Sequence, residues 1–381
     1  MITVKKSNLG LQNSVMVALI CAIILLFVGC SPKPEVFQWQ IPEGFPTPNV
    51  PVDNPMTKEK VSLGKALFFE PALSGNGAMS CSTCHRAENA FSEPRPTSSG
   101  STGEAGRRNA LALVNVAYNG SLTWAHNGID TIEQQLMIPL FNQHPVEMGV
   151  TGNEKAVLAR FNTDEYKSLF TQAFGDEQVS FDRMVKALAS FVRSLTSFDS
   201  AFDDYAYNNN DAALNASQLR GLDLFFSERL ECFHCHGGFN FTQSSQHAFQ
   251  QLDLRPFHNT GLYDVDGNGA YPESDQGLIE VTRNRKDMGR FRAPTLRNIA
   301  LTAPYMHDGS LADLDAVIAF YAAGGLGNGS KSPLKSPFMP GFVLTAEEHQ
   351  DLKAFLHSLT DMNFITSLDN QADVNPPSVN Q

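Results

Sequence analysis

The sequence predicts a mainly α-helical fold in which long irregular loops join the helices. Apolar residues recur at helical spacing in several segments, whereas no stretch alternates strands and helices as βαβ units do. The chain contains 28 glycines and 21 prolines among its 381 residues, so many turns must interrupt the helices. The clearest amphipathic segment is 181–198, whose apolar stripe comprises Phe181, Met184, Val185, Leu188, Phe191, Val192 and Leu195.

Three further segments carry the signals of helix ends. TIEQQL (131–136) and TAEEHQDLKAFLHSL (345–359) each begin with threonine, and a glutamine or glutamate follows three residues later, as in a capping box. In 314–321 the apolar side chains share one face, and the paired glycines that follow are expected to end that helix. The segment 368–381 is polar and is predicted to be a disordered tail.

The N-terminus has the composition of an export signal. Lys5 and Lys6 precede an apolar run of 14 residues (15–28), and the segment ends in FVGC, with a small residue before Cys30. These features predict a bacterial lipoprotein signal peptide over residues 1–30, lipidated at Cys30. An uncleaved anchor helix is the alternative, although a membrane span needs about 20 residues. Both interpretations export the body of the protein, and we expect a periplasmic protein held at the outer membrane by its lipid anchor only.

The charge and the cysteines narrow the possible functions. The formal net charge is −12, which argues against a nucleic-acid partner because phosphates require a basic face. Of the six cysteines, two lie in the predicted signal peptide. The other four form two CxxC pairs, CSTCH at 81–85 and CFHCH at 232–236, each followed at once by histidine.

The segments before the two pairs also resemble each other. LGKALFFEPALSGNGAMS precedes the first pair and LRGLDLFFSERLE precedes the second, and both have a Leu-Phe-Phe core in an apolar-periodic stretch. This weak internal repeat predicts two related modules in tandem. After a linker at 31–50, we therefore expect an N-terminal domain at 51–205 and a C-terminal domain at 206–367.

Three kinds of site use paired cysteines. A zinc site could take all four, but the pairs lie about 150 residues apart, and zinc does not need a histidine directly after each pair. A thioredoxin-like redox pair is expected in a βαβ setting, which is missing. Covalently bound haem c accounts for every residue, because two thiols add to the two vinyl groups and the adjacent histidine binds the iron.

The fold prediction thus becomes two tandem cytochrome c-like haem domains. In CFHCH, His236 is the iron ligand and His234 is only a spacer. The residues predicted to hold the two haem groups are Cys81, Cys84 and His85 for the first and Cys232, Cys235 and His236 for the second.

Over about residues 50–365 the chain resembles the bacterial di-haem cytochrome c peroxidase superfamily, which includes MauG. The resemblance rests on NPMTKEKVSLGKALFF, FFSERLECFHCHGGFNF, FHNTGLYD and GRFRAPTLRNIALTAPYMHDGS, and it is closest to the MbnH-like branch. Enzymes of MauG type use peroxide to oxidise residues of a partner protein, and the MbnH-like branch converts a partner's tryptophan to kynurenine. The resemblance therefore implies hydrogen peroxide as the oxidant and a protein as the partner.

The resemblance also implies a sixth ligand for the second haem. In the family this ligand stands fourteen positions after the histidine of PY-x-H-x-G, which is His307 here, and thus corresponds to Tyr321. The helical pattern alone leaves Tyr321 open to be a packed core residue, and Met306 and His307 are rival ligands. His307 is expected instead at the haem edge. A phenolate is a hard donor that stabilises high oxidation states, whereas methionine sulfur favours ferrous iron.

The first haem corresponds to the peroxide site of the family. The loop SSGSTGEAGRRN (98–109) has no histidine to serve as a removable sixth ligand, so the distal side of this haem is expected to be open. The resemblance assigns proton transfer to Glu147, assisted by Gln135, with Pro139 as a wall of the pocket. Residue type alone leaves Glu147 and Gln135 open to be surface groups, and His144 to be either a helper or a surface histidine.

Two further assignments come from the resemblance. Trp124 corresponds to the tryptophan between the haems, where an aromatic ring shortens the electron-transfer step; its alternative role is packing. A calcium ion between the domains is implied, with Asn109, Thr302 and Pro304 as ligands. The run DVDGNGAYPESD (264–275) imitates part of an EF-hand loop, but an acidic turn is the preferred interpretation because flanking helices are not evident.

These features predict a periplasmic di-haem peroxidase-type oxidoreductase that uses hydrogen peroxide to oxidise a partner protein, with an aromatic side chain such as tryptophan as the target. One alternative is a cytochrome c peroxidase that takes electrons from a small cytochrome or cupredoxin. The second alternative is a non-catalytic di-haem electron carrier in which both irons have six ligands.

Overall fold

The computed structural model describes residues 34–250, 255–372, 377 and 379. Contacts divide the chain into two units, Met1–Pro34 and Glu35–Gln381, and the fold and the sites belong to the second unit. The predicted signal peptide and its lipidation site Cys30 lie outside the described residues. None of the helices in the described ranges is long and apolar enough to cross a membrane.

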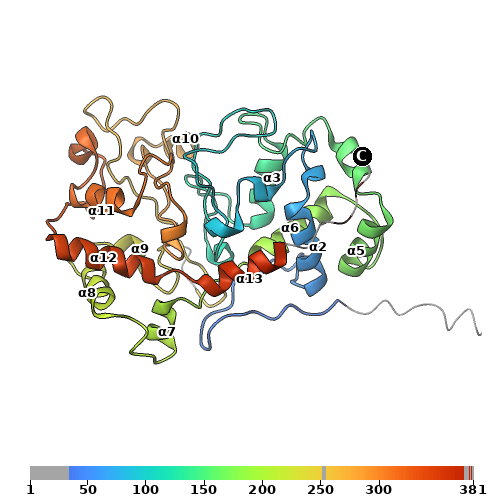
Figure 1. Cartoon of the computed structure of the whole chain (residues 1–381). Coiled ribbons are helices and arrows are strands. Elements are labelled where there is room, and N and C mark those ends of the chain that lie inside the picture. Colours follow the sequence, from blue (N-terminus) through green and yellow to red (C-terminus); the bar gives the residue numbers. More distant parts are fainter. Residues whose placement is uncertain (1–33, 251–254, 373–376, 378, 380–381) are drawn as a thin grey trace, which may run out of the picture. The chain divides into compact units, whose positions relative to one another are not determined.

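The second unit is mainly helical, as the sequence predicts (Figure 1). Extended pairing within the described ranges is limited to isolated bridges, such as those that join Arg86 to Ser92 and Ser99 to Ala105. Short 3-10 turns, including η2 (Cys81–Thr83) and η6 (Ile299–Leu301), interrupt the loops. The α-helices are α2 (Lys58–Phe69), α3 (Ile132–Phe141), α4 (Glu154–Arg160), α5 (Asp164–Phe174), α6 (Phe181–Ser194), α7 (Ala201–Tyr207), α8 (Ala216–Phe225), α9 (Phe233–His236), α10 (Ile279–Thr282), α11 (Leu314–Ala322), α12 (Ala346–Ser358) and α13 (Met362–Ala372).

The predicted helix ends have the expected local chemistry. The side chain of Thr131 accepts a hydrogen bond from the Gln134 backbone at the start of α3, and Thr345 does the same from Glu348 at the start of α12. Helix α11 ends at Ala322, just before two glycines with φ values of 68° and 126°. Only glycine adopts such left-handed backbone readily, so the pair stops the helix where the sequence predicts.

The last helix of the described chain reaches into the segment predicted to be a disordered tail. Helix α13 (Met362–Ala372) covers the first five residues of the segment predicted as a disordered tail, 368–381. The Phe364 backbone donates to the Asp361 carboxylate at the start of this helix, and Ile365 is 4% exposed in a small apolar cluster. This anchoring lets the helix continue into a polar sequence that would not be helical alone.

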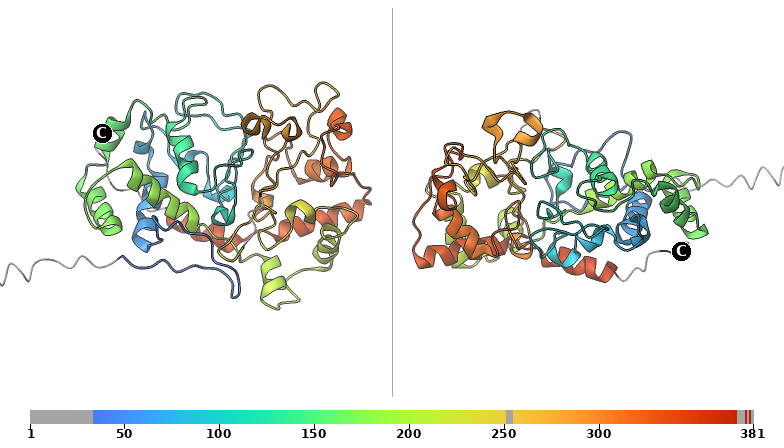
Figure 2. Two further views of the ribbon diagram at one scale, coloured as in Figure 1. Left: turned by 180° about the vertical axis from the view of Figure 1, so that it is seen from behind. Right: turned by 90° about the horizontal axis from the view of Figure 1, so that it is seen from above.

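Two pairs of helices form the framework of the fold: α2 packs on α6, and α8 packs on α12 (Figures 1 and 2). Each pair touches at a glycine. A Cβ atom on Gly64 would lie 1.9 Å from the carbonyl oxygen of Ala187, and one on Gly221 would lie 2.0 Å from that of Asp351. Both glycines stand three residues before the repeated Leu-Phe-Phe core, so the repeat in the sequence is a repeat in helix packing.

Three phenylalanine rings pack together beside each helix pair. Phe68, Phe91 and Phe191 lie with ring centroids 5.1–6.3 Å apart in the first half of the chain. Phe225, Phe241 and Phe355 lie 5.2–6.2 Å apart in the second half. We call α2, α6 and residues 81–91 the first module, and α8, α12 and residues 232–241 the second module.

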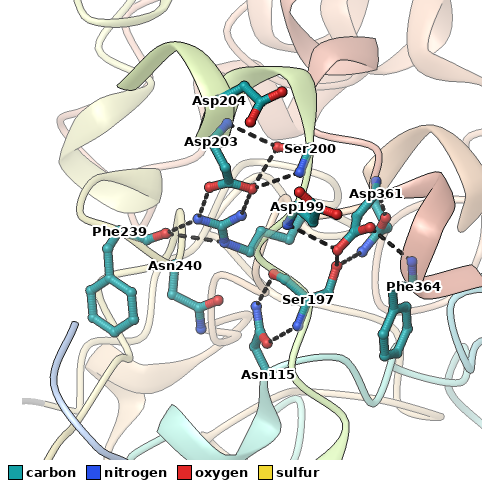
Figure 3. A network of polar contacts seen from close by, with 12 residues as sticks. Asn115, Ser197, Asp199, Ser200, Asp203, Asp204, Phe239, Asn240, Asp361 and Phe364 are labelled. Atoms are coloured by element: carbon teal, nitrogen blue, oxygen red, sulfur yellow. Dashed lines mark hydrogen bonds and ion pairs between the residues drawn. The ribbon is translucent and has the colours of Figure 1, made fainter. Parts of the chain in front are cut away.

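A buried hydrogen-bond network joins the two halves (Figure 3). Ser197 and Asn115 exchange two hydrogen bonds of 2.8 and 3.0 Å, and the Ser197 hydroxyl donates to Asp361 over 2.8 Å. The Asn298 side chain in turn donates to the Ser197 hydroxyl and accepts from the Asp361 backbone. All four residues are at most 2% exposed, so the network holds loops from both halves in one arrangement.

Candidate haem sites

The histidine of each CxxCH motif is oriented by a backbone carbonyl. His85 Nδ1 donates to the Phe91 carbonyl over 2.8 Å, and His236 Nδ1 donates to the Phe241 carbonyl over 3.3 Å. Phe91 and Phe241 both have positive φ values, 59° and 49°, which turn the two carbonyls in the same way. Because Nδ1 carries the proton, the lone pair of Nε2 is available to bind a metal, as in histidines that bind iron.

The ionisation of these groups favours metal binding over redox chemistry of the thiols. Burial lowers the pKa of His85 and lowers that of His236 to about 4, which favours the neutral ring, the form that binds a metal. The four cysteines are free, and burial raises the pKa of Cys81 and of Cys232 to about 12. A thioredoxin-like pair needs a lowered thiol pKa, so the structure argues against that chemistry.

A cavity extends from the second CxxCH motif toward the first half of the chain. Tyr321 reaches it from α11, and burial together with the nearby thiols of Cys235 and Cys232 raises the pKa of its phenol. His307 also lies on the wall, where its ring stacks on Phe291 at a centroid distance of 3.7 Å. The wall includes the predicted site residues Asn109, Trp124, Cys232, Cys235, His236, Thr302, Pro304, His307 and Tyr321.

The wall also contains residues that test whether haem fits. Its lining is largely apolar, but Arg292 is 3% exposed and its Nη1 atom is buried without a hydrogen-bond partner within the described ranges. Burial lowers the pKa of this guanidinium to about 10. An apolar cavity with a free histidine Nε2 and one unpaired cation suits a flat macrocycle that carries both iron and carboxylates. The residues present therefore fit haem.

The first CxxCH motif lies close to the predicted proton-transfer residue. The Glu147 carboxylate is near enough to the thiols of Cys81 and Cys84 to raise their pKa values, after the larger effect of burial. Burial also raises the pKa of Glu147 itself. The Oε1 atom of Gln135 is buried without a hydrogen-bond partner in the described part of the chain, which suits a side chain that awaits a ligand.

Two loops and the end of α3 position Glu147. The Met148 backbone donates to the Pro139 carbonyl over 2.8 Å, so the return from α3 brings Glu147 back beside the helix that carries Gln135. The Ser101 backbone donates to the Glu147 carbonyl, and a Cβ on Gly100 would lie 1.7 Å from a neighbouring carbonyl oxygen. The side chain of His144 is exposed on the same loop, in keeping with a surface histidine.

Trp124 is held from both halves of the chain. Its Nε1 donates to the Asn109 carbonyl over 2.8 Å, and its own carbonyl accepts from the Arg292 backbone over 2.8 Å. Asn109 and Arg292 stand six residues before Asn115 and Asn298, which both have positive φ and both join the network of Figure 3. Trp124 is thus held through its indole by one half and through its backbone by the other, at equivalent positions of the two halves.

The three predicted calcium ligands all line the cavity of the second CxxCH motif. Asn109 uses its side-chain amide to bind the carbonyls of Arg95 and Pro96, while Thr302 and Pro304 stand on the facing loop. In the acidic run 264–275, by contrast, the side chains of Asp264 and Asp266 accept hydrogen bonds from backbone N–H groups of their own turn. That arrangement is the acidic turn preferred from the sequence.

Sequence reasoning did not assign Arg292, Met339 or Asn119, all of which line the second cavity. A signal for Arg292 was present, because RNALALVN (108–115) and FRAPTLRN (291–298) repeat the same pattern and place Asn109 opposite Arg292. His234 is absent from the cavity wall; its Nε2 lies 2.7 Å from the Glu231 carboxylate and its ring stacks on Phe338.

Comparisons with known proteins agree with this geometry. A family model described as di-haem cytochrome c peroxidase matches residues 58–211. A cytochrome-c peroxidase (IdrP1) of Pseudomonas sp. (strain SCT) is 35% identical over 335 residues, which cover 83% of this chain and 85% of that protein. The chain belongs to the di-haem cytochrome c peroxidase family. It is therefore a peroxidase-type oxidoreductase of a family with two haem cofactors.

Other members of the di-haem peroxidase family are similar as well. The methylamine utilization protein MauG of Methylophilus methylotrophus is 33% identical over 321 residues, covering 84% of this chain and 86% of that protein. A crystal structure of a MauG-like protein associated with microbial copper homeostasis is 44% identical, with a TM-score of 0.84, and covers 90% of this chain and 99% of that one. Peroxidases and MauG-type proteins are thus both among the relatives.

Proposed function

We propose that this peroxidase uses hydrogen peroxide to oxidise an aromatic side chain, such as a tryptophan, of a partner protein. The observation that carries the proposal is Tyr321, which reaches the cavity of the second CxxCH motif together with His236. A hard phenolate donor opposite histidine favours an iron that holds an oxidising equivalent over one that collects electrons from a carrier. The 44% identity with a MauG-like protein supports the same choice.

Each site residue has a defined part in this proposal. A haem at each CxxCH motif supplies redox-active iron. His85 and His236 would hold the two irons through Nε2, the cysteines would fix the macrocycles, and Tyr321 would supply a further ligand atom at the second site. His307 packs at the haem edge. Asn109, Thr302 and Pro304 bind calcium through oxygen atoms, which is the ligand type that this hard cation prefers.

Glu147 moves a proton during peroxide cleavage. Its raised pKa, caused by burial, brings the carboxylate closer to the basicity needed to take a proton from one peroxide oxygen and deliver it to the other. Gln135 holds the peroxide through its unpaired Oε1 atom, which accepts a hydrogen bond from a peroxide O–H, and Pro139 keeps the pocket narrow. Peroxide accepts two electrons and two protons and leaves as two waters, and the partner's side chain supplies the electrons through Trp124.

The location of the protein belongs to the same proposal. The predicted signal sequence exports the chain to the periplasm, where c-type haem is attached, and Cys30 carries the lipid that holds it at the outer membrane. Hydrogen peroxide and the partner protein meet the enzyme there.

The test compares two electron donors. The holoenzyme is given hydrogen peroxide with either a reduced small c-type cytochrome or an extract of periplasmic proteins, which is then searched by mass spectrometry for oxidised aromatic side chains. The proposal expects slow turnover of the cytochrome and a peroxide-dependent change on a tryptophan or tyrosine of one extract protein. Rapid turnover of the cytochrome with every extract protein unchanged would contradict it.

A cytochrome c peroxidase is the second candidate function. Met306 and Met339 both line the second cavity, and a methionine ligand would suit an iron that receives electrons from a carrier. The relative that is 35% identical bears the name cytochrome-c peroxidase. Low-temperature EPR of the oxidised holoenzyme separates the two candidates. Tyrosinate ligation predicts one high-spin signal beside one low-spin histidine–tyrosinate signal, whereas methionine ligation predicts a low-spin histidine–methionine signal.

A further inference from the structure

Arg292 is held at the junction between Trp124 and the second cavity. Its Nε donates to the Thr123 carbonyl over 3.1 Å, and its backbone N–H donates to the Trp124 carbonyl over 2.8 Å. The guanidinium is therefore fixed along one edge. Its Nη1 atom has no partner among the described residues, although Arg292 as a whole is only 3% exposed and lies on the cavity wall.

The other fully buried arginines of the described chain are paired with carboxylates. Arg193, 2% exposed, binds Glu133 over 2.8 Å. Arg297, 1% exposed, binds Asp203 over 2.8 Å and also stacks over the ring of Phe198. A buried cation without a counter-charge is strongly unfavourable, so proteins pair such groups or neutralise them. Arg292 breaks the pattern, and it lines the cavity in which the second haem is expected.

We propose that Arg292 binds a propionate carboxylate of the haem attached at Cys232 and Cys235, and so couples that haem to Trp124. The proposal rests on the function proposed above only in requiring haem at this site. A guanidinium donates well to a carboxylate, and a propionate is the anionic part of a macrocycle that otherwise suits an apolar wall. Arg292 is a positioning residue in this role, because it acts on Trp124 and on the iron through the propionate.

The first half of the chain lacks the corresponding charge. Asn109 stands at the equivalent position, and it meets Trp124 through its backbone carbonyl, not through a cation. An electrostatic effect is therefore expected at one haem only. A cation near the second haem disfavours the ferric state, which has the greater positive charge, and thus raises the midpoint potential of that haem.

The test is a redox titration of the holoenzyme in which the two haems are followed by their separate EPR or visible signals. Arg292→Met should lower the midpoint potential of the second haem and leave that of the first unchanged. Its potential should also become dependent on pH near neutrality, because a propionate without its cation binds a proton more readily. Arg292→Lys keeps the charge and should restore most of the original potential. Arg229→Met, on an exposed side chain paired with Glu348, serves as the control.

Equal potentials in Arg292→Met and the unchanged protein would overturn the inference, as would an equal shift of both haems. If Arg292→Met does not attach haem, Arg292→Gln retains hydrogen-bond donors without the charge and should give the same lowered potential. A crystal structure of the unchanged holoenzyme decides independently, since it must place a propionate oxygen within hydrogen-bond distance of Nη1. These results do not depend on what the enzyme oxidises, so failure of the partner assay leaves them readable.

Discussion

The loops after the two CxxCH motifs are built alike, but the charges around them differ. In both modules a phenylalanine at positive φ accepts the histidine Nδ1–H, a glycine lets two helices touch, and three phenylalanine rings fill the space beside them. The first motif is surrounded by the carboxylates of Glu93 and Glu147, whose charges act on its cysteines. The second cavity also has a carboxylate, that of Glu231, but it adds the unpaired cation of Arg292 and the phenol of Tyr321.

The two modules thus share the parts that would hold a macrocycle and differ in the side chains that we propose decide its chemistry. The shared parts are backbone carbonyls and close-packed glycines, which tolerate little change. The differing parts are side chains on α3, α11 and the loops between helices, which can change without loss of the helix pairs. The proposed proton-transfer group, Glu147, lies in the first half of the chain, and the proposed hard ligand, Tyr321, lies in the second.

The largest expected effect is the loss of peroxidase rate when Glu147, near the first CxxCH motif, is replaced. Glu147→Gln should lower the rate of peroxide consumption by about 100- to 10,000-fold, because the amide cannot relay a proton. Burial raises the pKa of Glu147 above its ordinary value of 4.5, and the group must be ionised to accept a proton. The rate should therefore fall as the pH drops through that raised pKa. Stopped-flow kinetics over a pH series would measure both effects.

The control for that variant is Glu88→Gln, on an exposed carboxylate near the same motif, which should leave the rate unchanged. If Glu147→Gln kept the original rate and pH profile, the proposed difference in chemistry between the two modules would be contradicted.

The two helix pairs, α2 with α6 and α8 with α12, should lose similar stability when the glycine at each contact is replaced. Gly64→Ala and Gly221→Ala each place a methyl group about 2 Å from a backbone carbonyl, so each should destabilise the fold by about 1–3 kcal/mol or more. Thermal unfolding followed by circular dichroism would show comparable losses. Gly106→Ala, where the nearest atom is 3.4 Å away, should be close to neutral. A loss confined to one glycine would show that the two helix pairs are not equivalent.

Replacing the phenol of Tyr321 should reduce the ability of the second haem site to hold an oxidising equivalent. Tyr321→Met should reduce oxidation of the partner protein by at least about tenfold and increase turnover with reduced cytochrome c, since the softer ligand favours ferrous iron. The EPR signal should change to a histidine–methionine type. Tyr321→Phe keeps the ring without the oxygen and should give a high-spin signal. An unchanged low-spin signal in both variants would mean that another residue is the ligand.

The smallest expected effect is the loss of a helix cap on either side. Thr131→Ala at α3 and Thr345→Ala at α12 each remove an acceptor for a backbone N–H and should cost about 1 kcal/mol. Denaturant unfolding would measure the change. Thr102→Ala, on an exposed loop residue, should change the unfolding midpoint little. A peroxidase rate altered by Thr131→Ala but not by Thr345→Ala would show that α3 must be rigid to position Gln135.

The sequence predicted the parts of this molecule that depend on local signals. A CxxCH motif contains the residues for covalent haem attachment within five positions. The N-caps of α3 and α12 require only a threonine and the residue three positions later. The helical character of the fold followed from the period of the apolar residues. The family resemblance then supplied Tyr321 and Glu147, which no local pattern distinguishes from a core tyrosine or a surface carboxylate.

The remaining features depend on contacts between distant segments. The repeat of 108–115 in 291–298 marks the position of Arg292, but only the folded chain shows that its Nη1 atom is buried and unpaired. The extension of α13 through Ala372 likewise depends on Ile365, which packs into an apolar cluster with distant residues. The charge pattern and the apolar period do not show which distant segment a residue will contact. The unpaired Arg292 and the extension of α13 were therefore not predicted.

The network around Ser197 has a consequence for the speed of charge exchange. Electron tunnelling between two metal centres weakens exponentially with their separation, so a small hinge motion would make the rate fluctuate. Asn115 and Asn298 fix equivalent turns of the two halves to the same serine, deep in the protein (Figure 3). Such a joint keeps the separation constant, and we expect the exchange between the two irons to be insensitive to solvent viscosity.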